Sequence, residues 1–240
     1  KWVLLVSINP GGPNNGSATQ YFVGDFDGKN FVLDESFNTE TEEEQGFWVD
    51  YGRDNYAGVT FSNVENKDGG KLFMGWMSNW LYANEVPTEN WRSAMTIART
   101  LELIKSDNTY RLTSNPVPEL DEFKIEKLKN SNVSIKGKTL LTTSKAVDFT
   151  SVQINFKIEN LIDGVYNFEL TNSEGDSLRF GYDSSMNNYF VDRDNAGNTD
   201  FSNKFSDRIA IAPRTNTQKD WTGTIVLDKT SIELFFDNGQ

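Results

Sequence analysis

The sequence predicts an all-β protein, and three observations predict it. Short runs rich in aromatic and β-branched residues recur along the chain, Gly, Asn and Asp residues separate them as turn residues do, and apolar and polar residues alternate within many of them. Aromatic residues make up 13% of the 240 positions. The chain is therefore long enough and apolar enough to bury a sizeable core.

Four aromatic-rich segments supply the strands expected in the first half of the chain. In order they read YFVGDFDGKNFV (21–32), NYAGVTFSNV (55–64), KLFMGWMSNW (71–80) and SAMTIARTLEL (93–103). The Asp-Gly pair inside the first segment predicts a hairpin turn. If the third segment is one continuous strand, period-2 alternation places Trp76, Ser78 and Trp80 on the same face.

The second half has more regular alternation. Its segments read VQINFKIEN (152–160), YNFELTNSEGDSLRFGYD (166–183), NYFVDRDNAG (188–197) and TGTIVLDKTSIELFFDNG (222–239), and the EGD and DNAG sequences predict hairpin turns. Strands of even spacing are typical of a two-sheet sandwich, whereas aromatic strands with irregular connections are typical of propeller blades. The loop TSNPVPELDEF (113–123) separates the two patterns, so we predict domains at 1–115 and 116–240.

Composition excludes several classes of function. The formal net charge is -12, so most of the surface would repel a nucleic acid. The longest apolar stretch near the start, WVLLV, is far too short for a membrane span. The chain has no His and no Cys, which excludes triads based on His, thiolate chemistry and the common zinc sites. Acid/base chemistry would have to use carboxylates, Tyr or Lys. No cofactor and no metal are expected.

The stretch GWMSNW (75–80) carries the strongest candidate for a binding site. An indole ring can pack in a core, or it can present a flat face on which the apolar C–H face of a sugar stacks. Composition favours the core for each tryptophan taken alone. We expect Trp76 to belong to the core and Trp80, at the end of the strand, to line a pocket.

Two acidic segments have simpler interpretations than catalysis or metal binding. The run NTETEEEQ (38–45) has no apolar neighbour and is expected to be a solvated loop. The segment DRDNAG (192–197) imitates the start of a calcium loop, but Ala196 offers no ligand at position 5 and Asn203 stands at position 12, where the loop needs a bidentate Glu. We therefore expect a hairpin turn there.

Four motifs, in this order, resemble the second half of a family 32 glycoside hydrolase, the family of invertases, exo-inulinases and levanases. They are WVLLVSINPGGPNNGSATQYFVGDFDGKNF, DYGRDNYAGVTF, GWMSNWLYANEVPTENWRSAM and SIELFFDNGQ. The resemblance covers essentially the whole chain. It implies part of a five-bladed β-propeller followed by a C-terminal β-sandwich, and retaining hydrolysis of terminal fructosyl units in sucrose, levan or inulin.

The resemblance also implies roles for four residues. Trp80 matches a tryptophan that forms part of the wall around the terminal fructosyl unit. Asp50 and Arg53 in DYGR match an acidic and basic pair near the substrate, in which Arg replaces the more usual Lys. Asn9 matches a position bordering the acceptor subsite, and the alternative for Asn9 is a turn residue before Pro10.

The motifs that carry the family's catalytic carboxylates do not occur in this sequence. Family members place the nucleophilic Asp in W-M-N-D-P-N-G, a stabilising Asp in R-D-P and the acid/base Glu in E-C-P. We therefore assign no catalytic residue here and expect the stretch to be an internal part of a longer polypeptide that is inactive alone. The alternative is a non-catalytic carbohydrate-binding or structural β-protein derived from that fold.

The expected partner is a fructose-containing oligosaccharide or polysaccharide, with no nucleic acid and no membrane span. A homo-oligomer is possible. Because family members are usually exported, the resemblance implies a secreted, cell-surface or periplasmic location.

Overall fold

The computed structural model describes residues 1–38, 46–64, 69–106 and 109–240, and antiparallel strands dominate these ranges. The all-β prediction is confirmed, because the only α-helix in the described ranges is the single turn α1 (Glu35–Asn38). None of the helices in these ranges has the length and apolar character of a membrane-crossing segment. The acidic run at 38–45 lies almost entirely outside the described residues.

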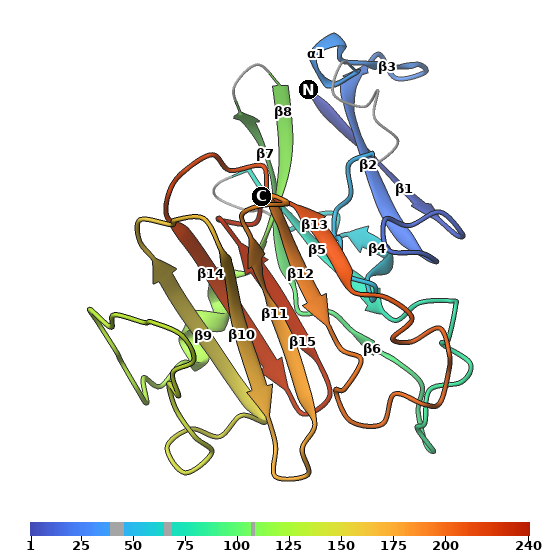
Figure 1. Ribbon diagram of the computed structural model, residues 1–240. Coiled ribbons are helices and arrows are strands. Elements are labelled where there is room, and N and C mark those ends of the chain that lie inside the picture. The colour runs from blue at the N-terminus through green and yellow to red at the C-terminus, as the bar shows by residue number, and fades with distance from the viewer. Residues whose placement is uncertain (39–45, 65–68, 107–108) are drawn as a thin grey trace.

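Two sheets form the N-terminal part of the molecule, and we call them the N-terminal sheets (Figure 1). One has the strand order β1-β2-β3, and the other has the order β4-β5-β7-β8 with β6 beside β5. The strands are β1 (Trp2–Ile8), β2 (Ala18–Phe26), β3 (Phe31–Leu33), β4 (Tyr56–Thr60), β5 (Lys71–Met77), β6 (Ala94–Met95), β7 (Arg99–Ser106) and β8 (Thr109–Pro116).

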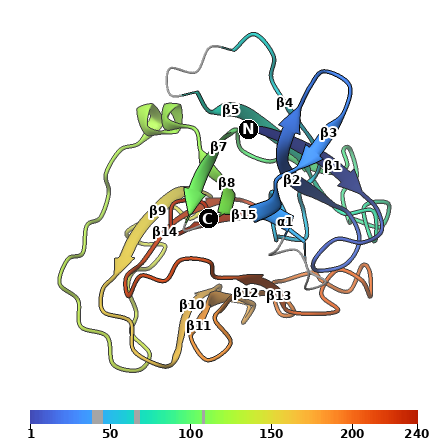
Figure 2. The same cartoon turned by 90° about the horizontal axis from the view of Figure 1, so that it is seen from above.

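Two further sheets, the C-terminal sheets, follow in the chain. Their strand orders are β10-β11-β12-β13 and β15-β14-β9. The strands are β9 (Ser151–Ile158), β10 (Val165–Thr171), β11 (Ser177–Asp183), β12 (Asn188–Asp192), β13 (Ala210–Pro213), β14 (Trp221–Asp228) and β15 (Ile232–Phe236). Figure 2, seen from above, shows the two pairs of sheets side by side.

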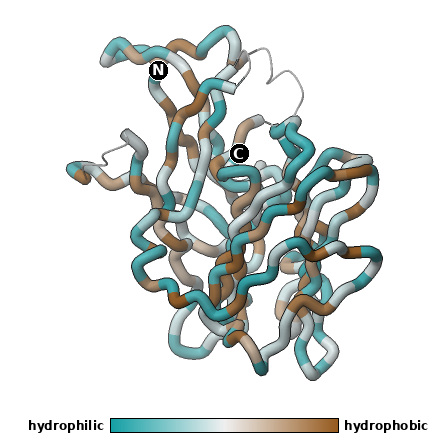
Figure 3. Tube along the Cα trace, turned by 90° about the vertical axis from the view of Figure 1, so that its left-hand side faces the viewer, coloured by the Kyte–Doolittle hydropathy of each residue, from teal (hydrophilic) through white to brown (hydrophobic). Residues whose placement is uncertain are grey.

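Each pair of sheets has its own hydrophobic core. The N-terminal core joins strands of both sheets through buried Tyr21, Val23, Phe73 and Leu101. The C-terminal core joins Phe180 and Tyr189 of one sheet to Trp221, Ile225 and Phe236 of the other. In Figure 3 hydrophobic segments run through the middle of these sheets, and hydrophilic loops connect them. The alternation along each strand therefore directs apolar side chains toward the facing sheet.

Most of the linker between the two pairs lies outside both cores. It begins with the 3-10 helix η1 (Pro118–Phe123) and continues through residues 124–150 without a strand. Figure 2 shows this segment running around the outside of the molecule. Residues 124–141 are exposed although several of them are apolar, and Phe149, near the end of the linker, packs against the C-terminal core.

Three turns test the hairpin predictions. The Asp-Gly turn is confirmed, since the Asp27 carboxylate accepts hydrogen bonds from the amides of Lys29 (2.8 Å) and Asn30 (2.7 Å) between β2 and β3. The EGD turn is also confirmed, between β10 and β11. The DNAG turn forms, with the Ala196 amide bonded to the Arg193 carbonyl at 3.1 Å, but residues 193–209 separate β12 from β13, so the connection is not a tight hairpin.

Two predicted element boundaries are wrong. Strand β8 continues through the polar residues of TSNP, because they pair with β7 and the Ser114 amide donates to the Gly239 carbonyl at 2.9 Å. Strand β5 ends at Met77, three residues before the predicted end, because the chain then turns with the Tyr82 amide bonded to the Asn79 carbonyl at 3.1 Å. Period-2 alternation therefore does not extend to Trp80.

Charged side chains join the N-terminal to the C-terminal sheets. Arg193 donates to Asp54 at 2.6 Å, and its guanidinium lies 3.7 Å from the ring centroid of Phe205. Arg53 donates to Asp207 at 2.7 Å. These contacts bring the loop after β12 against loops of the N-terminal sheets.

Candidate substrate-binding site

Three loops of the N-terminal sheets converge, and they carry the residues singled out in the sequence. We call them the glycine loop (9–17, between β1 and β2), the aspartate loop (50–55, before β4) and the tryptophan loop (78–83, after β5). The glycine loop and the tryptophan loop adjoin strands that contribute to the N-terminal core, and the aspartate loop directly follows the buried core residue Val49. The loops are therefore held on a rigid frame, as binding loops commonly are.

Asn79 ties the three loops together. Its fully buried side chain donates from Nδ2 to the carbonyls of Asn15 (3.1 Å) and Arg53 (2.9 Å). Its Oδ1 accepts from the amides of Ser17 (3.2 Å) and Leu81 (3.0 Å). The amide uses both donors and both acceptor positions, so it satisfies backbone groups that would otherwise be buried without a partner.

A single hydroxyl places Asn9 next to Trp80. Ser17 Oγ donates to Asn9 Oδ1 at 3.2 Å and accepts from the Trp80 amide at 3.0 Å. Asn9 is exposed and precedes Pro10 through a cis peptide bond. An exposed amide thus lies beside the backbone that carries the candidate platform.

Trp80 has the exposure that a sugar platform needs. Its side chain is 50% exposed, and its ring centroid lies 4.9 Å from that of Trp76, which in turn lies 6.3 Å from that of Tyr56. Trp76 is half-buried between these two rings and is not among the buried residues of the N-terminal core, so its predicted place in that core is wrong. The three rings form an aromatic row with Trp80 at its exposed end.

Asp50 has a constrained carboxylate that remains partly open to solvent. Oδ1 accepts from the Gly52 amide at 2.6 Å, and Oδ2 accepts from Asn55 (3.1 Å) and from Arg99 (2.5 Å). The side chain is 19% exposed. Its lone pairs are oriented by neighbours on two elements, which is the arrangement expected of a preorganised acceptor.

Arg53 contacts the loop after β12 through its guanidinium. Its side chain is buried, donates to Asp207 and to the Phe205 carbonyl (3.1 Å), and lies 5.7 Å from the ring centroid of Tyr82. The backbone of Arg53 contributes to the convergence of loops through Asn79, whereas its guanidinium belongs to the contact with the C-terminal sheets. Asn9 and Trp80 are thus brought together, and Arg53 is not brought to them.

The sequence patterns did not identify three polar residues that organise this region: Asn79, Arg99 and Glu233. Arg99 and Glu233 occur inside strand patterns, in ARTLEL and SIELFF, at positions that both prove to be buried. A charged residue at an inward-facing strand position is a signal of a buried ion pair, because an unpaired charge there is too costly. Asn79 stands between Ser78 and Trp80 in the sequence and gives no comparable signal.

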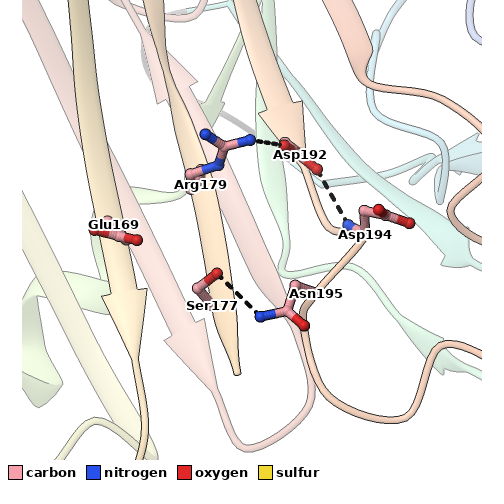
Figure 4. Close-up of a pocket in the computed structure, with 6 residues that line it drawn as sticks. All are labelled: Glu169, Ser177, Arg179, Asp192, Asp194 and Asn195. Carbon is pink, nitrogen blue, oxygen red and sulfur yellow. Dashed lines mark hydrogen bonds and ion pairs between the residues drawn. The ribbon is translucent and has the colours of Figure 1, made fainter. Parts of the chain in front are cut away.

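The C-terminal sheets carry a separate polar hollow of about 250 Å³ (Figure 4). Asp192, Asp194 and Asn195 of the DRDNAG segment line it with Glu169, Ser177 and Arg179. Asp192 is paired with Arg179, and Asp194 donates its amide to Asp192 at 3.2 Å. Within the described ranges no group of carboxylates has the arrangement of a metal site.

Comparison with known families gives two matches that together cover nearly the whole chain. Residues 1–116 match the model described as glycosyl hydrolases family 32 N-terminal domain. Residues 119–240 match the model described as glycosyl hydrolases family 32 C terminal.

Individual relatives agree with these matches. The chain is similar to a levanase of Bacillus subtilis, at 35% identity over all of this chain and 35% of the relative. It is similar to an extracellular exo-inulinase of Meyerozyma guilliermondii, at 32% identity over all of this chain and 47% of the relative. Among solved structures it is similar to a fructofuranosidase variant of Schwanniomyces occidentalis complexed with fructosylnystose, with 32% identity and a TM-score of 0.67 over all of this chain and 48% of that one. The chain spans between about a third and a half of these proteins.

Proposed function

Because the chain belongs to glycosyl hydrolase family 32, we propose that it is part of a retaining β-fructofuranosidase that removes terminal fructosyl units from sucrose, levan or inulin. One observation carries the proposal beyond the family. A half-exposed indole, Trp80, lies beside the exposed amide of Asn9, and the loops that hold both are tied together by a buried side chain. A platform next to polar groups is the combination that sugar recognition requires.

In this proposal Trp80 stacks on the apolar face of the fructosyl ring, while polar side chains orient its hydroxyl groups. Asn9 offers an amide at the border of the platform. Asp50 offers carboxylate oxygens whose direction is set by Gly52, Asn55 and Arg99. Such fixed acceptors bind hydroxyl groups without reorganising, so binding energy is available for orientation of the glycosidic bond. Arg53 contributes to this site through its backbone carbonyl, which accepts a hydrogen bond from Asn79 and so helps to hold the loops together.

The reaction itself requires two carboxylic groups about 5 Å apart, one as nucleophile and one as acid and then base. We assign neither role to a residue of this chain. The nucleophile and the acid would come from a part of the polypeptide that carries the family's motifs. The residues described above then bind and orient the substrate.

We further propose that residues 1–115 are the C-terminal part of a β-propeller and residues 116–240 a β-sandwich. The two separate cores and the two family models, one for each half, support this division. The proposed partner is a fructose-containing oligosaccharide or polysaccharide. A secreted or cell-surface location is proposed as well, and the extracellular relative supports it.

The test is hydrolysis by the whole protein. We expect it to release fructose from sucrose, levan or inulin, and to form first the fructose anomer that has the configuration of the substrate, observable by NMR at early times. A glucan without fructosyl units serves as the control. We expect residues 1–240 alone to release none. Absence of hydrolysis by the whole protein, or inversion of the anomer, contradicts the proposed function.

A further inference from the structure

A buried arginine connects the aspartate loop to the C-terminal sheets. Arg99, the first residue of β7, donates from Nη1 to Asp50 Oδ2 at 2.5 Å and from Nη2 to Glu233 Oε2 at 2.6 Å. Its side chain is 6% exposed and that of Glu233 is 7% exposed. Glu233 lies on β15, which belongs to the C-terminal sheets. The planar guanidinium suits this role, since it can hold two carboxylates in fixed directions at once.

Glu233 is held in place independently of Asp50. Its Oε1 accepts from the Ile97 amide at 2.8 Å, two residues before Arg99. The Arg99 guanidinium also lies 4.9 Å from the ring centroid of Phe235 on the same strand β15. Burial raises the pKa of Glu233 above its usual range, against the opposing effect of Arg99. Strand β15 thus determines where the Arg99 guanidinium lies, through the Glu233 carboxylate and the Phe235 ring.

Asp50 depends on Arg99 for its connection outside the aspartate loop. Its contacts with Gly52 and Asn55 are made within residues 50–55 and move with that loop. The contact with Arg99 spans 49 positions in the sequence and reaches a strand of the core. Arg99 on β7 therefore fixes the direction of the Asp50 carboxylate.

We infer that Glu233 is a positioning residue for substrate binding by Asp50, acting through Arg99. The inference rests on the proposed function, because it concerns the same site. Glu233 neutralises and orients Arg99 from the C-terminal sheets, and Arg99 then aims the Asp50 carboxylate at a substrate hydroxyl. The C-terminal sheets accordingly take part in substrate recognition through a buried side chain that never contacts the sugar.

The alternative is that Glu233 only stabilises the fold. A double-mutant cycle separates the two possibilities, because residues that act through one another give non-additive effects on kcat/KM. In the whole protein, Glu233→Gln keeps the size of the side chain but removes its charge. We expect kcat/KM for the hydrolysed fructoside to fall about 10-fold or more, mainly through a higher KM, as a displaced orienting group would cause. In the background of Asp50→Asn, the same change should lower kcat/KM less than about 2-fold, since Glu233 acts through Asp50.

A matched control lies directly after strand β15, which carries Glu233. Asp237, which follows β15, forms a buried ion pair with Arg214 at 2.7 Å and has no contact with Arg99 or Asp50 in the described structure. Asp237→Asn should lower the free energy of unfolding while leaving kcat/KM per folded molecule unchanged. If Glu233→Gln gives no folded protein, Arg99→Lys tests the same connection, because an ammonium group cannot hold both carboxylates as a fork does.

The outcomes are distinguishable. If the wild-type protein hydrolyses fructosides and Glu233→Gln leaves kcat/KM unchanged, or lowers it equally with and without Asp50, the positioning role is overturned and the proposed function stands. If the wild-type protein hydrolyses none, the proposed function falls, and the same cycle is measured on fructose binding by calorimetry. Non-additive losses of affinity then support the positioning role. Additive losses, or no binding by the wild type, overturn it.

Discussion

At the scale of single residues, Trp80 and Trp221 represent opposite roles of one residue type. Trp80 is half-exposed at the end of an aromatic row, whereas Trp221 is fully buried among Phe156, Phe236 and Tyr189. The sequence places Trp80 at the end of one strand-like segment and Trp221 directly before another, and these positions do not by themselves reveal which ring is buried. The difference arises because β5 ends before Trp80, while Trp221 begins a strand whose inward face meets the opposite sheet.

We predict that Trp80→Ala in the whole protein lowers kcat by about 100-fold while changing the free energy of unfolding by about 1 kcal/mol or less. In the proposed site the ring orients substrate, and it is not among the residues of the N-terminal core. Trp221→Ala is the control and should cost about 3–5 kcal/mol of stability. Thermal unfolding and steady-state kinetics on both variants check this. A Trp80→Ala protein with a large loss of stability and normal specific activity of its folded fraction would contradict the platform role.

At the scale of elements, alternation and turn chemistry predict most strands correctly but not their ends. The hairpin around Asp27 is predictable because the side chain itself makes the turn. The end of β8 is not predictable, because pairing with β7 keeps the polar residues Thr113 and Ser114 in a strand. Where such a strand ends depends on its pairing with distant segments of the chain, and local propensity does not describe that pairing.

The candidate site shows the same limit. Trp80 and Asn9 are identified by motifs, but Asn79, Arg99 and Glu233 depend on contacts that the sequence does not display. The Arg99 to Glu233 contact joins residues 134 positions apart, and Asn79 reaches residues 26 and 64 positions away. Motif comparison therefore singles out the exposed residues Trp80 and Asn9, but not the buried residues that hold the loops in place.

We predict that Asn79→Ala lowers the free energy of unfolding by about 3 kcal/mol or more, because it leaves several buried amides and carbonyls without partners at about 1–3 kcal/mol each. Gln153→Ala is the control, since its side-chain amide makes an exposed hydrogen bond to Asn155. That substitution should change stability by about 0.5 kcal/mol or less. Chemical denaturation of both variants measures the difference. Equal stability of the two proteins would show that Asn79 does not tie the loops.

At the scale of the whole molecule, side-chain contacts hold the two pairs of sheets against each other, whereas the linker only connects them along the chain. Arg193 of the C-terminal part pairs with Asp54, while Arg53 and Arg99 of the N-terminal part pair with Asp207 and Glu233. The Tyr82 ring also lies 5.2 Å from that of Phe205. Burial raises the pKa of Tyr82, which keeps its hydroxyl protonated as the donor to Asp54 at 2.6 Å. In contrast, residues 124–141 of the linker are exposed along their length.

We predict that limited trypsin cleavage within the linker leaves the two parts associated. Exposed lysines offer cleavage sites at Lys127, Lys129, Lys136, Lys138 and Lys145. The buried ion pairs should hold the fragments together, so they should co-elute in size-exclusion chromatography although a denaturing gel separates them. Arg193→Ala should let the fragments part at a lower denaturant concentration. Separate elution directly after cleavage of the wild type would contradict this account.

The four hydrogen bonds of Asn79 also bear on how the protein folds. Three of them span 26, 62 and 64 positions of the chain. Bringing such distant segments together costs chain entropy before any of the bonds can form, so they are expected to close after the local hairpins. The convergence of the three loops is then a late event. In the proposed function, a partly folded chain can then hold most of its strands while lacking the sugar site, so sugar binding would report completion of folding more faithfully than strand content does.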